Sequence, residues 1–302
     1  MSAATIVADI EVVCRDGSVI GECPTWVSAE SALYWVDIKG PALYRLHHQT
    51  GDRRTWKLPS DCGAFALVHG QAAAIVALRT GLFRLDLTTG GLDRLMAPPF
   101  DPALFRFNEG IVDETGRFWF GVMFDPLDGD TSHPMKGQLH SYSVSQGMRV
   151  HDDRAEIHNG MAFVPGGRDM IIAHSEDGSI SRLRFDPGNG TIGYRRPFAR
   201  VPSELGVPDG AAMDETGHYW CAVYDGGRLR RFTPDGQVDR DILLPISKPT
   251  MCCFAGKDLD TLYVTSATEH LTPDQRREQP LAGALLRLDP GVLGLAKPVY
   301  VR

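Results

Sequence analysis

The sequence contains one seven-residue segment twice. Residues 113–119 (DETGRFW) return at residues 214–220 (DETGHYW), 101 positions later. Residues 164–172 (VPGGRDMII), halfway between the two copies, again place a glycine turn before an apolar run. Further turns of this kind complete a set of six, which start near residues 28, 69, 113, 164, 214 and 256. A period of about 40–50 residues is the signature of a repeat architecture.

Each of these turn-and-strand units is followed by a second strand whose apolar residues alternate with polar ones. Residues 42–46 (ALYRL) and 81–85 (GLFRL) are two examples. Alternation with period two indicates half-buried strands, and a small sheet buries both faces only when neighbouring sheets pack against it. Although 302 residues suggest two domains on length alone, propellers reach this size as one unit. We therefore predict an all-β fold, a six-bladed β-propeller, with residues 1–302 as a single domain.

The two ends of the chain and two inserts complete the predicted architecture. Residues 5–13 and 298–301 both have strand patterns, and we expect them to pair in one terminal blade and close the ring, unless either end frays. Residues 124–137 and 268–283 are inserts between the middle strands of a blade, where loops can cover one mouth of the channel. In the second insert, Thr272 suits the N-cap of a short surface helix.

The composition excludes several classes of protein. The chain is 43% apolar and 23% charged, as in a globular domain, and its net charge of −7 offers no basic field to a nucleic acid. Its most apolar stretch, residues 63–78, is too short and too interrupted to span a membrane, and no export signal is visible. We expect a cytoplasmic protein, a monomer or weak homodimer, with free cysteines.

Polar residues recur five or six positions before each turn, where the innermost strand of a blade would begin. They are Glu22, Asp61, Asn108, Asn159, Asp209 and Thr250. Carboxylate and amide oxygens that converge in a channel suit a divalent cation, and buried acids without such a partner would be costly. Asn-Gly and Asp-Gly are also ordinary turn dipeptides. Their recurrence at matched positions favours a site for one divalent metal ion.

An ordered set of short motifs along the chain resembles the family of gluconolactonase and regucalcin (senescence marker protein-30). The motifs are residues 21–26 (GECPTW), 106–110 (RFNEG), 159–161 (NGM), 208–210 (PDG) and 248–249 (KP). The resemblance covers nearly the whole chain and implies a six-bladed propeller lactonase. Bacterial members that open sugar lactones, including xylonolactonases, look closest, because of residues 34–38 (YWVDI) and 279–283 (QPLAG).

The resemblance also implies roles for individual residues. Glu22, Asn159 and Asp209 match the metal ligands of the family, and Asp209 also matches its proposed catalytic base. Arg106 and Asn108 match substrate-binding positions. For Arg106, a salt bridge between blades is the alternative.

Three other polar residues are further candidates for the site. Glu109 and Asp125, beside matched positions, are further substrate-binding candidates, with solvated loop acids as the alternative. Members of the family usually carry an acid where this chain has His174. We expect His174 to be either a replacement polar group at the channel mouth or a histidine of the core.

These features together predict metal-dependent hydrolysis of a sugar lactone to the aldonic acid, a reaction on a carboxylic ester bond. The metal would polarise the carbonyl and activate water. Oxygen-rich ligation favours Ca²⁺, with Zn²⁺, Mn²⁺, Mg²⁺ and Fe²⁺ as alternatives. Two other functions stay open on the same scaffold: a metal-dependent esterase or organophosphate hydrolase, and a non-catalytic interaction propeller. The sequence does not identify the lactone.

Overall fold

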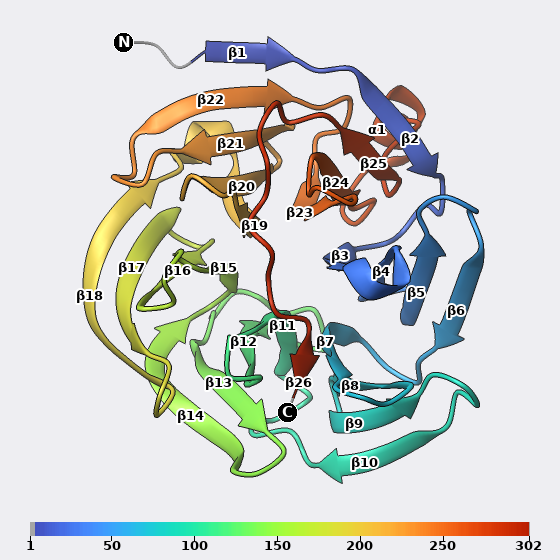
Figure 1. Cartoon of the computed structure of the whole chain (residues 1–302), viewed down its shortest axis with the longest axis vertical. Helices are drawn as coiled ribbons and strands as arrows, with labels where there is room; N and C mark the ends of the chain where they lie inside the picture. The colour runs from blue at the N-terminus through green and yellow to red at the C-terminus, as the bar shows by residue number, and fades with distance from the viewer. Residues whose placement is uncertain (1–3, 302) are drawn as a thin grey trace.

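The structure, a computed structural model, describes residues 4–301. Its strands form six sheets arranged as blades around a central axis, and the first strand of each blade lies innermost (Figure 1). The predicted all-β, six-bladed propeller is therefore confirmed.

The blades follow one another in chain order. The first contains β3 (Gly21–Val27), β4 (Ala32–Asp37), β5 (Ala42–His47) and β6 (Arg53–Lys57). The second contains β7 (Cys62–Val68), β8 (Ala73–Leu78), β9 (Gly81–Asp86) and β10 (Leu92–Met96). The third contains β11 (Phe105–Val112), β12 (Phe118–Phe124), β13 (Gly137–Ser143) and β14 (Gly147–Ala155). The fourth contains β15 (His158–Phe163), β16 (Asp169–His174), β17 (Ser179–Asp186) and β18 (Thr191–Arg200).

The last two blades include strands from the N-terminal part of the chain. The fifth contains β19 (Val207–Met213), β20 (Tyr219–Tyr224), β21 (Arg228–Phe232) and β22 (Val238–Leu243), and β1 (Ala4–Val7) pairs with β22 in parallel. The sixth contains β23 (Pro249–Ala255), β24 (Thr261–Ser266) and β25 (Leu285–Leu288), and β2 (Ile10–Cys14) is its outer strand.

The predicted pairing of the N- and C-terminal strands with each other is wrong for the described residues. The final strand, β26 (Tyr300–Val301), pairs in parallel with β7 of the second blade. The segment that leads to it crosses the centre of the ring (Figure 1). The N-terminal strand β2 already pairs with β25 in the sixth blade, and the final segment instead adds to the inner edge of β7, whose Leu67 N–H donates to Val299 O at 3.1 Å.

A buried aspartate explains the duplicated segment. Asp113 Oδ1 accepts hydrogen bonds from the backbone N–H groups of Thr115 and Arg117, at 2.8 and 3.0 Å. Its Oδ2 accepts from the indole Nε1 of Trp119 at 2.9 Å. Asp214 makes the equivalent three contacts in the fifth blade. A fully buried carboxylate needs such donors. The repeated sequence therefore supplies the hydrogen bonds that fix the turn between the two inner strands.

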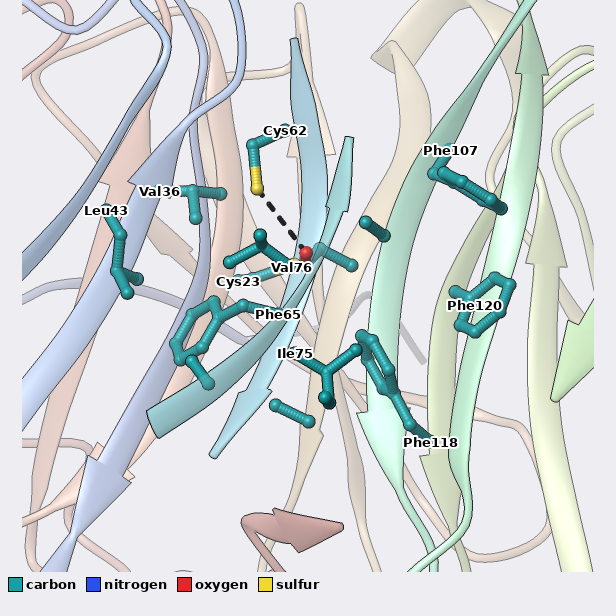
Figure 2. Close-up of a cluster of buried hydrophobic side chains, with 14 of the residues drawn as sticks. Cys23, Val36, Leu43, Cys62, Phe65, Ile75, Val76, Phe107, Phe118 and Phe120 are labelled. Atoms are coloured by element: carbon teal, nitrogen blue, oxygen red, sulfur yellow. Dashed lines mark hydrogen bonds between the residues drawn. The ribbon is translucent and has the colours of Figure 1, made fainter. Parts of the chain in front are cut away.

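Apolar side chains pack between adjacent blades. Figure 2 shows part of one such cluster, in which Val36 of the first blade and Phe107 of the third lie on opposite sides of the second blade, which contributes Phe65. The rings of Phe107 and Phe120 meet edge to face with 5.0 Å between centroids. Burying a phenylalanine side chain stabilises a fold by about 1.5–3 kcal/mol. This packing holds the inner strands, and the side chains they carry, in a fixed ring.

The inserts contain the one α-helix of the described residues. α1 (Pro273–Glu278) follows Thr272, whose side chain accepts a hydrogen bond from Gln275 N at 3.2 Å, so the predicted short helix is confirmed. Two single 3₁₀ turns, η1 (Ser28–Glu30) and η2 (Ser203–Leu205), occur elsewhere. Across residues 4–301, no helix combines the length and the apolar character that crossing a bilayer requires.

Candidate active site at one mouth of the channel

Every inner strand changes register near its start. The shifts follow Glu22 in β3, Cys62 in β7, Asn108 in β11, Asn159 in β15, Pro208 in β19 and Pro249 in β23. Such a bulge bends the strand and turns a side chain in a new direction. The predicted ring of polar residues therefore has a common structural cause, because the positions of the ring coincide with these irregularities.

The Asn-Gly and Asp-Gly pairs lie inside strands rather than in turns. Asn159 and Gly160 belong to β15, and Asp209 and Gly210 belong to β19. Gly160 has a φ of 58°, and a Cβ at this position would lie 2.3 Å from the hydroxyl oxygen of Tyr219. The glycine is required by the bulge and by this close approach. The turn-dipeptide interpretation of these pairs is wrong.

A pocket of about 270 Å³ lies where the polar side chains meet. It brings together five of the predicted site residues, namely Glu22, Arg106, Asn108, Asn159 and Asp209. Its other lining residues are Ile20, Met123, Ile157, Ser175, Val207, Tyr224, Asp225, Glu269 and His270. The last two belong to the insert between β24 and β25, which therefore forms part of this wall.

A chain of hydrogen bonds connects three blades along the pocket. Arg106 Nη1 donates to Asn108 Oδ1 at 2.7 Å, and Asn108 Nδ2 donates to Asn159 Oδ1 at 2.8 Å. Asn159 Nδ2 donates to Ser175 Oγ at 3.0 Å, and that hydroxyl donates to Pro208 O at 2.6 Å. The chain fixes the orientation of both amides. One lone pair of Asn159 Oδ1 remains available to a ligand in the pocket.

Two of the four acids that line the pocket, Glu22 and Asp209, have no cationic partner among the described residues. Glu22 is 4% exposed and Asp209 is 8% exposed, and within residues 4–301 neither carboxylate forms an ion pair. Burial raises the pKa of Glu22 to about 7. Burial, followed by the negative charges of Glu22 and Glu109, raises the pKa of Asp209 well above its usual range. Such groups are costly unless a cation compensates them.

Glu109 lies behind the pocket. Its side chain is fully buried, and Oε1 accepts a hydrogen bond from Met161 N at 2.8 Å, whereas Oε2 has no partner among the described residues. Burial and the nearby charge of Glu22 raise the pKa of Glu109 well above its usual range. Glu109 is not a solvated loop acid. Its assignment to substrate binding stays a prediction.

Asp125 supports Arg106 from outside the pocket lining. Its Oδ2 accepts from Arg106 Nε at 3.1 Å and from Lys39 Nζ at 2.5 Å, and it also pairs with Arg79. Burial raises the pKa of Asp125, but Arg106 and the other two cations outweigh burial and lower it. Lys39 and Arg79 also pair with Asp61, the ring residue of the second blade. A direct contact of Asp125 with substrate stays a prediction.

His174 does not line the pocket. It is half-buried, and its Nε2 lies 2.8 Å from Asp153 Oδ1. The next residue, Ser175, reaches the pocket instead. Neighbouring residues of a strand point to opposite faces, so the polar group that β16 supplies at the mouth is a neutral hydroxyl. Of the two alternatives for His174, the replacement polar group at the channel mouth is therefore wrong.

Two pocket residues that were not predicted from the sequence, Met123 and Tyr224, follow the two copies of the repeated segment. Met123 and Tyr224 occupy equivalent places, four residues after Trp119 and Trp220, and both line the pocket. The Nζ atom of Lys248 lies 4.3 Å from the centroid of the Tyr224 ring. Extending the alignment of the two copies by four residues would have found this pair.

The fold and this site together define a class: a six-bladed propeller with an oxygen-donor pocket at one mouth of its channel. A family model described as "SMP-30/Gluconolactonase/LRE-like region" matches residues 20–268. The chain belongs to the SMP-30, gluconolactonase and regucalcin-like family.

Similar proteins match almost the full chain. It is 38% identical to 6-deoxy-6-sulfogluconolactonase of Pseudomonas putida, over 96% of this chain and 98% of that protein. It is 32% identical to L-arabinolactonase of Azospirillum brasilense, over 93% and 90% of the two chains. A crystal structure of regucalcin, a calcium-binding protein from Agrobacterium tumefaciens, superposes with a TM-score of 0.91 at 26% identity and covers all of both chains.

Proposed function

We propose that the protein hydrolyses a sugar lactone to the corresponding aldonic acid with the help of one divalent cation. The observation that carries this proposal is the pair of buried carboxylates, Glu22 and Asp209, that share a pocket with Arg106 and have no cation of their own. The lactonases among its relatives support a lactone as the substrate class.

Glu22, Asn159 and Asp209 would hold the cation. Two carboxylates and one amide oxygen are hard donors, which suit Ca²⁺ and also Mg²⁺ or Mn²⁺, and the calcium-binding regucalcin with the same fold supports Ca²⁺. When bound, such a cation polarises the lactone carbonyl and lowers the pKa of a coordinated water. The remaining chemistry belongs to side chains of this protein.

Asp209 takes the proton of the attacking water. The water oxygen forms a bond to the carbonyl carbon, and the bond between that carbon and the ring oxygen then breaks. The ring oxygen leaves as a hydroxyl group when Asp209 returns to it the proton taken from the water. With a cation bound, the pKa of Asp209 would fall, so this carboxylate would assist a water that is already activated rather than remove a proton from a free one.

Arg106 provides a fixed positive charge for the sugar hydroxyls or the developing oxyanion. Its side chain is 4% exposed, and three of its nitrogens are held, by Asn108, by Asp125 and by the sulfur of Met123. A guanidinium that is already oriented costs little reorganisation in the transition state. This arrangement favours a positioning role over a salt bridge between blades alone.

The size of the pocket supports a small substrate. About 270 Å³ is below the range of about 300–1,000 Å³ that is usual for drug-sized ligands. A monosaccharide lactone fits this space better than an oligosaccharide or a macromolecular partner does. The insert residues Glu269 and His270 and the aromatic ring of Tyr224 line the wall beside the ring acids.

The test is a panel of lactones assayed with protein that has been stripped by a chelator and refilled with Ca²⁺, Zn²⁺, Mn²⁺, Mg²⁺ or Fe²⁺ in turn. The panel contains gluconolactone, xylonolactone, L-arabinonolactone and 6-deoxy-6-sulfogluconolactone, with aryl esters and an organophosphate beside them. We expect lactone hydrolysis that disappears with the metal and returns with Ca²⁺. Faster turnover of the aryl ester or the organophosphate would favour the esterase alternative, and no hydrolysis at all would favour an interaction propeller.

A further inference from the structure

A second cluster of ligand-type side chains lies between the third and fourth blades. Asp153 comes from β14, His158 begins β15 and His174 ends β16. One ligand atom of each lies within 4.8 Å of the other two, and no other group of three or more His, Cys, Asp or Glu residues within 4–301 meets this criterion. None of the three lines the pocket described above.

His158 is oriented like a metal ligand. It is fully buried, and its Nδ1 lies 3.1 Å from the carbonyl oxygen of Val122. A histidine that donates its Nδ1–H to a carbonyl presents the lone pair of Nε2 to a metal. Among residues 4–301, His158 Nε2 has no hydrogen-bond partner, and it faces Asp153 Oδ1 at 3.5 Å. Two electron-rich atoms that face each other in a buried site call for a cation between them.

The tautomer of His158 with its proton on Nε2 would form longer hydrogen bonds. With the proton on Nε2, His158 would donate across 3.5 Å to Asp153 and accept at Nδ1 from Val122 N across 3.4 Å. Both distances exceed the usual range of about 2.7–3.2 Å for such bonds. The shorter contact, to the Val122 carbonyl, therefore favours the tautomer that leaves Nε2 free.

The other two residues complete a donor set that solvent can reach. His174 Nε2 lies 2.8 Å from Asp153 Oδ1, and its side chain is 11% exposed, which gives an ion a route to the cluster. Arg195 pairs with Asp153 Oδ2 and donates to Ser181 Oγ at 3.0 Å. Arg195 thus fixes the carboxylate and leaves Oδ1 facing the histidines.

We propose that Asp153, His158 and His174 form a second metal site, which binds Zn²⁺ or a similar transition-metal dication and connects the third blade to the fourth. Two imidazoles and one carboxylate are ligands that Zn²⁺ accepts with water at the remaining position. The site differs in chemistry from the all-oxygen pocket. It lies directly behind that pocket, because the backbone oxygen of His158 accepts a hydrogen bond from Asn108 Nδ2 at 2.9 Å.

The test measures Zn²⁺ bound per chain by equilibrium dialysis of the stripped full-length protein in excess Ca²⁺, which fills the oxygen pocket. We expect one Zn²⁺ in the wild type and in Glu22→Gln. In His174→Ala, we expect affinity to fall by about 100-fold or more, since loss of an outer partner alone costs about 10–100-fold. His133→Ala removes an exposed histidine and Cys14→Ser removes the half-buried thiol, so both should bind Zn²⁺ normally.

A thermal readout tests the connection between the blades. Zn²⁺ should raise the Tm of the wild type and of His133→Ala, and leave that of His174→Ala unchanged. Circular dichroism and lactone hydrolysis in Ca²⁺ establish that His174→Ala is folded. Equal Zn²⁺ binding by the wild type and His174→Ala, or no Zn²⁺ binding by the wild type, would overturn the proposal. The cluster would then be a hydrogen-bonded link only.

Discussion

Asn108 Nδ2 donates a 2.8 Å hydrogen bond to Asn159 Oδ1, so a candidate substrate-binding residue of the third blade orients a candidate metal ligand of the fourth. Arg106 closes the same chain on its other side, by donating to Asn108 Oδ1 at 2.7 Å. The buried amide of Asn108 therefore links the substrate-binding side of the pocket, at Arg106, to the metal-binding side, at Asn159.

Asn108→Ala should weaken metal binding and substrate binding together. Without the amide, Asn159 and Arg106 lose a partner that fixes their orientation, and loss of such an outer contact typically costs about 10–100-fold in metal affinity. Ca²⁺ titration by calorimetry measures one effect and KM for the best lactone measures the other. Ser175→Ala separates the two effects. It removes a partner of Asn159, so Ca²⁺ affinity should fall, but it leaves the contact between Asn108 and Arg106 intact, so KM should change little. Unchanged Ca²⁺ affinity in Asn108→Ala would contradict the coupling.

Glu22→Gln should make the metal-free protein more stable and the Ca²⁺-bound protein less stable than the wild type. The pKa of Glu22 is raised from 4.5 to about 7 in the fold, so its contribution to stability is present below about pH 4.5 and is lost as the pH rises towards 7. At pH 8, metal-free Glu22→Gln should therefore be more stable than the metal-free wild type, by up to about 3 kcal/mol. Denaturant unfolding with and without Ca²⁺ measures both forms.

With Ca²⁺ present, Glu22→Gln should instead be less stable than the wild type, because the variant lacks one charge of the ligand set. A variant that is less stable than the wild type in both conditions would show that Glu22 is not an uncompensated acid.

Metal binding should release protons. Below pH 7 the metal-free pocket holds Glu22 largely protonated, and Asp209 has a pKa that is raised further by the neighbouring acids. A cation binds the ionised forms, so Ca²⁺ affinity should fall as the pH is lowered from 7 to 5, and binding should expel protons in that range. Calorimetry in buffers of different ionisation enthalpy counts them. Glu22→Gln should release fewer protons than the wild type, and equal counts would argue against Glu22 as a ligand.

Asp125→Asn should weaken binding of the sugar lactone and leave metal binding unchanged. Asp125 contacts Arg106 Nε at 3.1 Å, and removing its charge frees the guanidinium to move. We expect KM to rise by about 10-fold with unchanged Ca²⁺ affinity, since a charge-assisted hydrogen bond contributes about 1.5–3 kcal/mol. Asp61→Asn is a matched control, because Asp61 pairs with Lys39 and Arg79 but not with Arg106. The same rise in KM in Asp61→Asn would refute the role given to Asp125.

The sequence predicted the blades because their cause is local. The buried aspartate, the glycine and the tryptophan of each copy of the repeat are close together in the chain, and the turn they build recurs at a fixed period. The ring residues were predictable for the same reason, since each bulge places its polar residue at the same distance from a turn. Four of the six ring residues, Glu22, Asn108, Asn159 and Asp209, do meet in one pocket.

Long-range contacts explain what the sequence could not predict. The two-residue strand β26 has no pattern that distinguishes pairing with β7 from pairing with the N-terminal strand. The place of Asp125 in the third blade depends on Lys39 and Arg79, which come from the first and second blades. His174 belongs to an inter-blade cluster because of Asp153, and the spacing of 21 residues between them indicates nothing about contact.

The most direct test of the proposed mechanism is kcat of Asp209→Asn at saturating Ca²⁺. Asparagine keeps an oxygen ligand and nearly the same shape, but it does not accept a proton from water. If Asp209 takes the proton of the attacking water, kcat should fall by about 10²–10⁴ while the variant still binds Ca²⁺ and lactone. A kcat close to that of the wild type once Ca²⁺ is in excess would contradict the account and leave Asp209 as a ligand alone.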